Sequence, residues 1–151
     1  MKPFETILVA IDFSDNANYA FDHAMTLARQ FNARLVLLHV INEPVDLRGF
    51  YVPHISFEQL EKEIEEGAGR MMDEFCQARL RDSGLEYRTL IATGIPYEEI
   101  NRAAEQEGAS LIVLGTHGRK GLDHIIFGST AERVVRSAPC PVLTIRLPAR
   151  D

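Results

Sequence analysis

Apolar positions in this chain fall into two alternating kinds of segment. Five segments are short runs of apolar, often β-branched residues, which are typical of strands, and the four segments between them repeat apolar residues at helical spacing. The strand-like runs occupy residues 7–11, 35–41, 85–92, 111–114 and 142–146. Strict alternation of strand and helix predicts an α/β fold in which helices cover both faces of a parallel sheet.

The apolar content of each run indicates where its strand lies in that sheet. The runs at 7–11, 35–41 and 111–114 are almost wholly apolar, as expected for strands buried on both faces. The run at 85–92 begins with polar alternation, and prolines flank the start of the run at 142–146, so both suit sheet edges. One order that fits, with right-handed crossovers, is 3-2-1-4-5. We therefore predict a single domain over 1–151, a doubly wound open sheet of five parallel strands.

The longest helical pattern precedes the third strand. Ser56 with Gln59 forms a capping box at its start, and Gly84 is a natural stop. The many glutamates between 58 and 66 favour a solvated face over a site. The predicted core stripe consists of Phe57, Leu60, Ile64, Ala68, Met71, Phe75 and Ala78. The last helix is predicted to turn Ala131, Val134 and Val135 inward.

Composition narrows the class of protein. A chain of 151 residues with 46% hydrophobic and 25% charged residues can bury a real core. The net charge of −6 argues against a general nucleic-acid binder. No apolar run approaches the roughly 20 residues of a membrane helix, and the first residues lead straight into a strand, so we expect a cytoplasmic protein without a signal peptide. Cys76 and Cys140 match no zinc or redox spacing, which favours reduced structural thiols.

The stretch from 111 to 130 carries the clearest chemistry. A buried strand runs into Gly115, Gly118 and Gly121, and then through Gly128 into a helical pattern. Glycine lets the backbone approach an anion closely, and the free N–H groups of a helix start favour negative charge. Arg119 and Lys120 add positive charge within this loop. The pattern predicts a phosphate-binding loop, with turn chemistry alone as the alternative.

The spacing of these glycines resembles a known signature. Gly115-x-x-Gly118, nine residues, then Gly128-Ser129 resembles the ATP-binding signature of the universal stress protein family. Further similarity lies in the first strand with Asp12, in the segments at 94–96 and 108–113, and in 137–143. The resemblance covers 4–146 and is weakest at 42–56. It implies the same 3-2-1-4-5 sheet.

The predicted topology locates a site independently of this resemblance. Open parallel sheets bind ligands beyond the carboxyl ends of their strands, where the strand order reverses. Here that point lies between the first and fourth strands, so Asp12 and residues 115–118 should converge although they are about a hundred residues apart. Alternatively, Asp12 only caps the next helix, a role that Ser14 or Asp15 can also fill.

Roles can be assigned at that point. Backbone N–H groups around the glycines and the hydroxyls of Ser129 and Thr130 would hold phosphate oxygens. Asp12 could accept from a ribose hydroxyl or contact Mg²⁺ indirectly, and Val40 could pack against adenine. The resemblance supports this set, and Arg119 is either a phosphate partner or a solvated side chain. The candidate cofactor-binding residues are Ala10, Asp12, Val40, Leu114, Gly115, Gly118, Arg119, Gly128, Ser129 and Thr130.

Histidines give no catalytic or metal signal. His117 and His124 lie in the glycine loop, but no cysteine or carboxylate is spaced with them as a metal motif requires, so a structural or surface role is favoured. His39 is interpreted as a satisfied histidine near the core. No catalytic residue is assigned, and the metal site is left unknown.

The resemblance implies a regulator that binds ATP, with or without Mg²⁺, and changes its contacts with a protein partner; ADP and AMP stay open as ligands. No general base or arginine finger is recognisable, so binding is favoured over turnover, with slow hydrolysis or self-phosphorylation as the upper limit. The alternative is an interaction module of the same fold without nucleotide. An adenylating enzyme would need a substrate domain for which the chain has no room.

The last strand suggests an assembly. Its edge offers unpaired backbone groups, which a second copy could cover across a two-fold axis. The family commonly dimerises through this strand, so we expect a homodimer through 142–145. The segment at 42–55, with its exposed-looking Phe50-Tyr51-Val52, is interpreted as a lid, a partner surface or a loop folded on its own domain.

Overall fold

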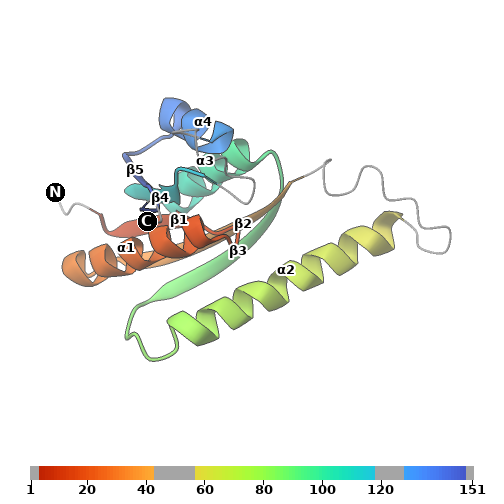
Figure 1. Ribbon diagram of the computed structural model, residues 1–151, viewed down its shortest axis with the longest axis horizontal. Helices are drawn as coiled ribbons and strands as arrows, with labels where there is room; N and C mark the ends of the chain where they lie inside the picture. The colour runs from red at the N-terminus through yellow and green to blue at the C-terminus, as the bar shows by residue number, and fades with distance from the viewer. Residues whose placement is uncertain (1–3, 43–56, 118–127, 149–151) are drawn as a thin grey trace.

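The structure, a computed structural model, describes residues 4–42, 57–117 and 128–148 (Figure 1). Strands and helices alternate along the chain, as the sequence predicts. In order they are β1 (Thr6–Ala10), α1 (Asp15–Phe31), β2 (Arg34–Asn42), α2 (Phe57–Arg79), β3 (Tyr87–Gly94), α3 (Pro96–Glu107), β4 (Leu111–Gly115), α4 (Ser129–Ser137) and β5 (Val142–Ile145).

The five strands form one parallel sheet in the order β3-β2-β1-β4-β5, so the predicted topology is confirmed. β1 is the central strand. Its Val9 pairs with Leu37 of β2 on one side and with Val113 of β4 on the other. β3 and β5 lie at the two edges, which agrees with the polar alternation of one and the prolines beside the other.

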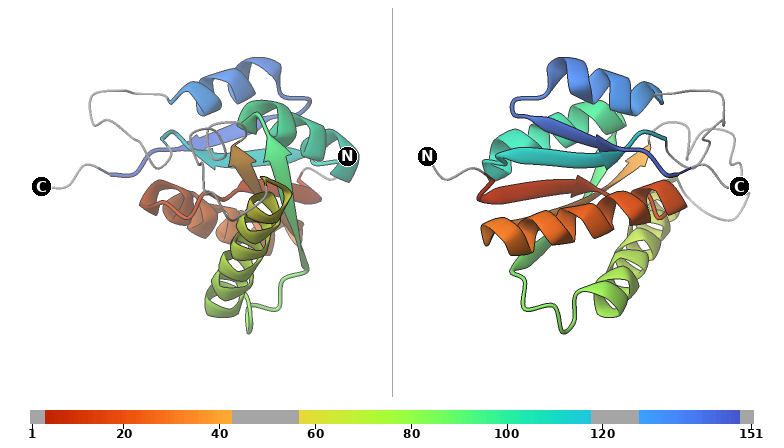
Figure 2. Two further views of the ribbon diagram at one scale, coloured as in Figure 1. Left: turned by 90° about the vertical axis from the view of Figure 1, so that its right-hand side faces the viewer. Right: turned by 60° about the vertical axis from the view of Figure 1, so that its left-hand side comes forward.

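Alternate residues of the central strands supply two separate cores. Ile7 and Val9 pack with α1 and α2 on one face, and Leu8 packs with α3 and α4 on the other. Figure 2 shows the two pairs of helices on opposite sides of the sheet. The crossovers to β2 and β3 therefore run over one face, and those to β4 and β5 over the other. This reversal leaves the carboxyl ends of β1 and β4 as the switch point.

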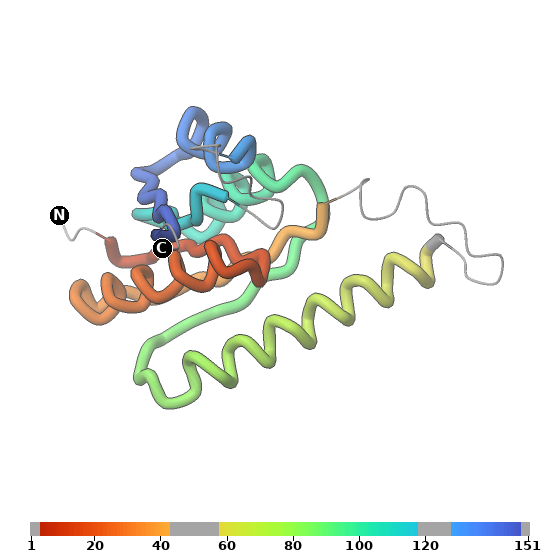
Figure 3. The backbone as a smooth tube through the Cα atoms, in the orientation of Figure 1, coloured from red at the N-terminus to blue at the C-terminus, as the bar shows by residue number. Residues whose placement is uncertain are grey.

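The predicted stripe of α2 is partly wrong. Met71 is 44% exposed and Ala78 is also exposed, whereas Met72 and Cys76 are buried. The buried positions recur every four residues, at Ala68, Met72 and Cys76. A row of residues with this spacing is inclined to the helix axis, so it follows a helix that crosses its neighbours at an angle. The tube in Figure 3 shows why: α2 lies obliquely beside the sheet, so only its carboxyl-terminal half covers β2 and β3.

The predictions for the ends of α2 and for the buried face of α4 were partly confirmed. α2 ends at Arg79, before Gly84, which takes a left-handed φ of 73° in the turn that follows. The residue Ser56 lies outside the described part of the chain. The prediction for α4 holds for Ala131 and Val134, which are buried, but not for Val135, which is 50% exposed. The face of α4 that packs on the core is therefore narrower than predicted.

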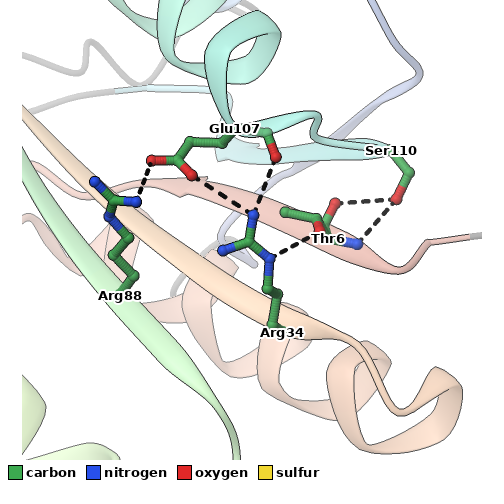
Figure 4. A network of polar contacts seen from close by, with 5 residues as sticks. All are labelled: Thr6, Arg34, Arg88, Glu107 and Ser110. Carbon is green, nitrogen blue, oxygen red and sulfur yellow. Dashed lines mark hydrogen bonds and ion pairs between the residues drawn. The ribbon is translucent and has the colours of Figure 1, made fainter.

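A polar network ties the amino-terminal edge of the sheet together (Figure 4). The carboxylate of Glu107, at the end of α3, lies 3.5 Å from Arg34 of β2 and 3.4 Å from Arg88 of β3. Arg34 also donates to the Thr6 hydroxyl, and the Ser110 hydroxyl donates to the Thr6 carbonyl. These contacts fix the strand starts at the edge opposite the switch point.

Gly115 controls how closely β4 approaches α1 at the switch point. A Cβ built on Gly115 would lie 3.2 Å from the backbone C and O atoms of Asn16, in the first turn of α1. Backbone atoms cannot rotate away as a flexible side chain can, so any larger residue must displace the helix. The glycine is thus required by packing at this position.

We predict that Gly115→Ala lowers the free energy of unfolding by about 1–3 kcal/mol, the usual cost of overpacking. Gly69→Ala is the matched control, because nothing lies within 4 Å of its added Cβ and its helical site should gain about 0.5–1 kcal/mol. Denaturant unfolding measures both. Equal responses of the two variants would contradict the close approach.

Candidate functional site

The site lies where β1 and β4 end side by side. The register pairs Val9 with Val113, so the residues that follow β1 run beside Gly115 and the start of the glycine loop. The contact between Gly115 and Asn16 joins the two segments directly. The structure therefore brings the Asp12 turn and the beginning of the loop together, as the topology predicted.

Asp12 is oriented by the residue that caps α1. Its Oδ1 accepts from the backbone N–H of Ser14 at 3.0 Å and from the Ser14 hydroxyl at 2.5 Å. Ser14 in turn is the N-cap, because its Oγ accepts from the N–H of Ala17 at 3.1 Å. Asp12 is therefore not the cap itself. It is a half-exposed carboxylate held by the cap, just beyond the end of β1.

The backbone of this turn takes an unusual conformation. Phe13 has φ of 63°, in the left-handed region that non-glycine residues avoid. Its ring lies 4.9 Å from the ring of His39, centroid to centroid. His39 is buried, and its Nδ1 donates to the carbonyl of Ile11 at 2.7 Å, which confirms the prediction of a satisfied histidine near the core.

Thr116 follows the end of β4, on the side of the candidate site opposite Asp12. It is 4% exposed, its N–H donates to the carbonyl of Ile145 at 3.0 Å, and its carbonyl accepts from the N–H of Gly128 at 2.6 Å. The second bond holds the residue before α4 against the end of β4. A Cβ on Gly128 would lie 3.1 Å from that same carbonyl, so the close contact requires glycine.

The amino end of α4 is suited to an anion. Gly128 is its N-cap and, as a glycine, has no side chain to accept a hydrogen bond from the first N–H groups. Ser129 is exposed and Thr130 is half-buried, so both lie where a ligand could reach the helix start. The helix dipole and the unpaired N–H groups favour negative charge at such an end. Glu132, in the first turn, opposes this partly, although it is paired with Arg136 at 2.8 Å.

The apolar candidates lie on the α3 and α4 face. Ala10 and Val40 are half-buried and pack against the core of that face near the carboxyl ends of their strands. Leu114 is 4% exposed, so its side chain belongs to the core. Gly118 and Arg119 lie outside the described residues.

Sequence reasoning missed two residues of this site. Nothing in the side chain of Phe13 signals a left-handed backbone, and Thr116 carried no signal except its place next to Gly115. The hydroxyl of Thr116 shares a hydrogen bond of 3.0 Å with Nδ1 of His117, which gives that histidine a structural contact.

Metal and thiol chemistry receive no support from the part of the chain that the structure describes. Across 4–42, 57–117 and 128–148, no three His, Cys, Asp or Glu residues gather as metal ligands would. Both cysteines are free thiols. Burial raises the pKa of Cys76, with the nearby Asp73 adding to the effect, and burial raises the pKa of Cys140. A raised pKa makes a thiol less reactive at neutral pH. None of the described helices is long and apolar enough to cross a membrane.

Comparison with known proteins gives a consistent result. A model of the universal stress protein family matches residues 3–146. The universal stress protein YxiE of Bacillus subtilis is 34% identical, over 95% of this chain and 99% of that protein. MJ0577 of Methanocaldococcus jannaschii is 30% identical, over 95% of each.

Solved structures agree. The MJ0577 structure has a TM-score of 0.81 at 31% identity and covers 97% of this chain and 99% of its own. A universal stress protein in complex with cAMP shares the fold, with a TM-score of 0.66 at 21% identity over 95% of this chain and 98% of its own. Sequence, topology and these likenesses agree, and the chain belongs to the universal stress protein family.

Proposed function

We propose that this chain is a single nucleotide-binding domain that holds ATP between the carboxyl ends of β1 and β4. It would act in the cytoplasm as a regulator in the response to stress, through nucleotide-dependent contact with a protein partner. One observation carries the proposal. The bond from the N–H of Gly128 to the carbonyl of Thr116 sets the start of α4, whose N-cap is a glycine, beside the end of β4, at the switch point of the sheet.

Each part of ATP has a counterpart at this edge. The N–H groups at the start of α4 and the hydroxyls of Ser129 and Thr130 suit the phosphates. The carboxylate of Asp12, held by Ser14, suits a ribose hydroxyl or a water bound to Mg²⁺. The half-buried Ala10 and Val40 offer apolar surface for adenine. Gly118 and Arg119 belong to the proposed phosphate loop on sequence grounds.

The proposed role is binding rather than efficient turnover. Fast phosphoryl transfer needs a positioned base and a cation that stabilises the transferring group. Among the described residues of this edge, the Asp12 carboxylate follows the end of β1, and Ser14 already donates two hydrogen bonds to it. Slow hydrolysis or self-phosphorylation is the most that this arrangement supports.

Calorimetry with ATP and Mg²⁺ tests the nucleotide site. We expect binding by the unmodified chain and a fall of roughly tenfold or more in affinity for Asp12→Asn, because a charge-assisted hydrogen bond contributes about 1.5–3 kcal/mol. The amide keeps an oxygen for Ser14, so the turn should stay intact. ADP and AMP titrated in the same way rank the ligands.

The matched control is Asp73→Asn, an exposed carboxylate on α2, which should leave the affinity unchanged. If the unmodified chain binds none of the three nucleotides, the nucleotide proposal fails. The interaction module without nucleotide then becomes the better account.

We also propose that two copies pair through β5. The carbonyls of Pro141 and Ile145 accept hydrogen bonds from the N–H groups of Ile112 and Thr116, at the two ends of the ladder to β4. In a parallel ladder, engaged positions alternate along the strand, so the backbone groups of Val142 and Thr144 point away from β4. β5 is the last strand of the sheet in the described chain, and an antiparallel copy would satisfy those outward groups.

Thr144→Pro tests this assembly without touching the ladder to β4, because proline removes only an outward N–H group. We expect a dimer for the unmodified chain and for Thr144→Val, and a folded monomer for Thr144→Pro. Light scattering during gel filtration, with circular dichroism to check the fold, measures this. A Thr144→Pro dimer, or a monomer before any substitution, would contradict pairing through β5.

A further inference from the structure

The turn that carries Asp12 is held in a conformation that its own sequence disfavours. Phe13 has a left-handed backbone, where an L side chain with a Cβ crowds the following carbonyl. Such a residue persists only when its surroundings over-determine it. The contacts that hold Phe13 therefore decide where the neighbouring Asp12 points.

Two of these contacts come from different elements. The ring of His39, on β2, packs against the ring of Phe13 with centroids 4.9 Å apart. Its Nδ1 also donates to the carbonyl of Ile11, so His39 contacts the residue before Asp12 and the residue after it. Phe75 of α2 meets the same Phe13 ring edge-on, with centroids 6.2 Å apart. Phe75 thereby joins α2 to the Asp12 turn.

Phe75 is itself anchored. Its ring packs edge-on against Phe21 at 4.9 Å, and the guanidinium of Arg79 lies 5.2 Å from its centroid. Arg79 is paired with Asp22 of α1 at 2.6 Å. Residues of both α1 and α2 thus hold the ring of Phe75 in place. The ring of Phe13 packs against this fixed ring.

We propose that Phe75 is a positioning residue for the nucleotide site, which acts through Phe13 on the orientation of Asp12. This inference rests on the proposed nucleotide function and extends it to α2, a helix that supplies none of the candidate ligand contacts. Because coupling is reciprocal, an occupied site would also stabilise the position of α2 around Phe75.

A double-mutant cycle of ATP affinity separates this role from plain core packing. Phe75→Leu keeps an apolar side chain but loses the ring, and it should weaken ATP binding about fivefold or more. If Phe75 acts through Asp12, the same substitution in the Asp12→Asn background should change affinity by less than about twofold. An undiminished effect in that background, or no effect in the unmodified chain, would overturn the proposal.

Leu80→Ala is the matched control. Leu80 is 2% exposed and lies in the same core, directly after α2, and it takes no part in the ring contacts that hold Phe13 and Phe75. It should lower the melting temperature at least as much as Phe75→Leu while leaving ATP affinity within about twofold. Equal losses of affinity in the two variants would show that only general core damage is being measured.

A second measurement does not depend on nucleotide. The N–H of Ser14 is protected by its bond to Asp12, so hydrogen exchange at this amide reports the turn directly. Without ligand, Phe75→Leu should speed this exchange at least about fivefold relative to Leu80→Ala. Phe13→Gly, which tolerates the left-handed backbone, should speed it similarly because the ring is lost.

The two failures are therefore distinguishable. If the unmodified chain binds no nucleotide but the Ser14 amide responds as expected, the proposed function fails and the coupling from Phe75 to the turn stands. If the Ser14 amide responds equally to Phe75→Leu and Leu80→Ala, the positioning role is wrong, whether or not ATP binds.

Discussion

The double pairing of β1 is the constraint on which the rest of the structure depends. Val9 is paired in register with Leu37 on one side and with Val113 on the other, and the helices that follow β1 and β4 lie on opposite faces of the sheet. The crossovers made by the described helices therefore separate at this point. Whatever residues follow β1 and β4 must form the edge at which open parallel sheets bind ligands. Asp12 and Thr116 occupy those positions.

The residues at the carboxyl ends of β1 and β4 adopt conformations and contacts that are energetically unfavourable by themselves. Phe13 takes a left-handed φ, and Gly115 and Gly128 pack where a Cβ would be crowded. Strain and close approach of this kind persist when neighbouring packing supports them, and they concentrate at functional sites. For Phe13 the support comes from His39 of β2 and Phe75 of α2. The opposite edge, with Glu107 between two arginines, shows ion pairs that bridge strand starts instead.

The sequence was sufficient for the topology because its signals were strong and redundant. Apolar runs identified β1, β2 and β4 as central, and prolines marked β5 as an edge. It was less reliable on α2, where a helical stripe drawn through Met71 missed the buried Met72, since the helix crosses the sheet obliquely. It could not give the backbone of Phe13, because that conformation is imposed by residues distant in the chain. The meeting of Asp12 with the β4 end followed from topology alone.

The most direct test of the nucleotide site is to identify what the protein carries from the cell. The chain is purified without added nucleotide, denatured, and the released small molecules are identified by mass spectrometry, before and after incubation with ATP and removal of free ligand. The account predicts an adenine nucleotide bound to the unmodified chain and its loss in Asp12→Asn. No adenine nucleotide in either sample of the unmodified chain would contradict it.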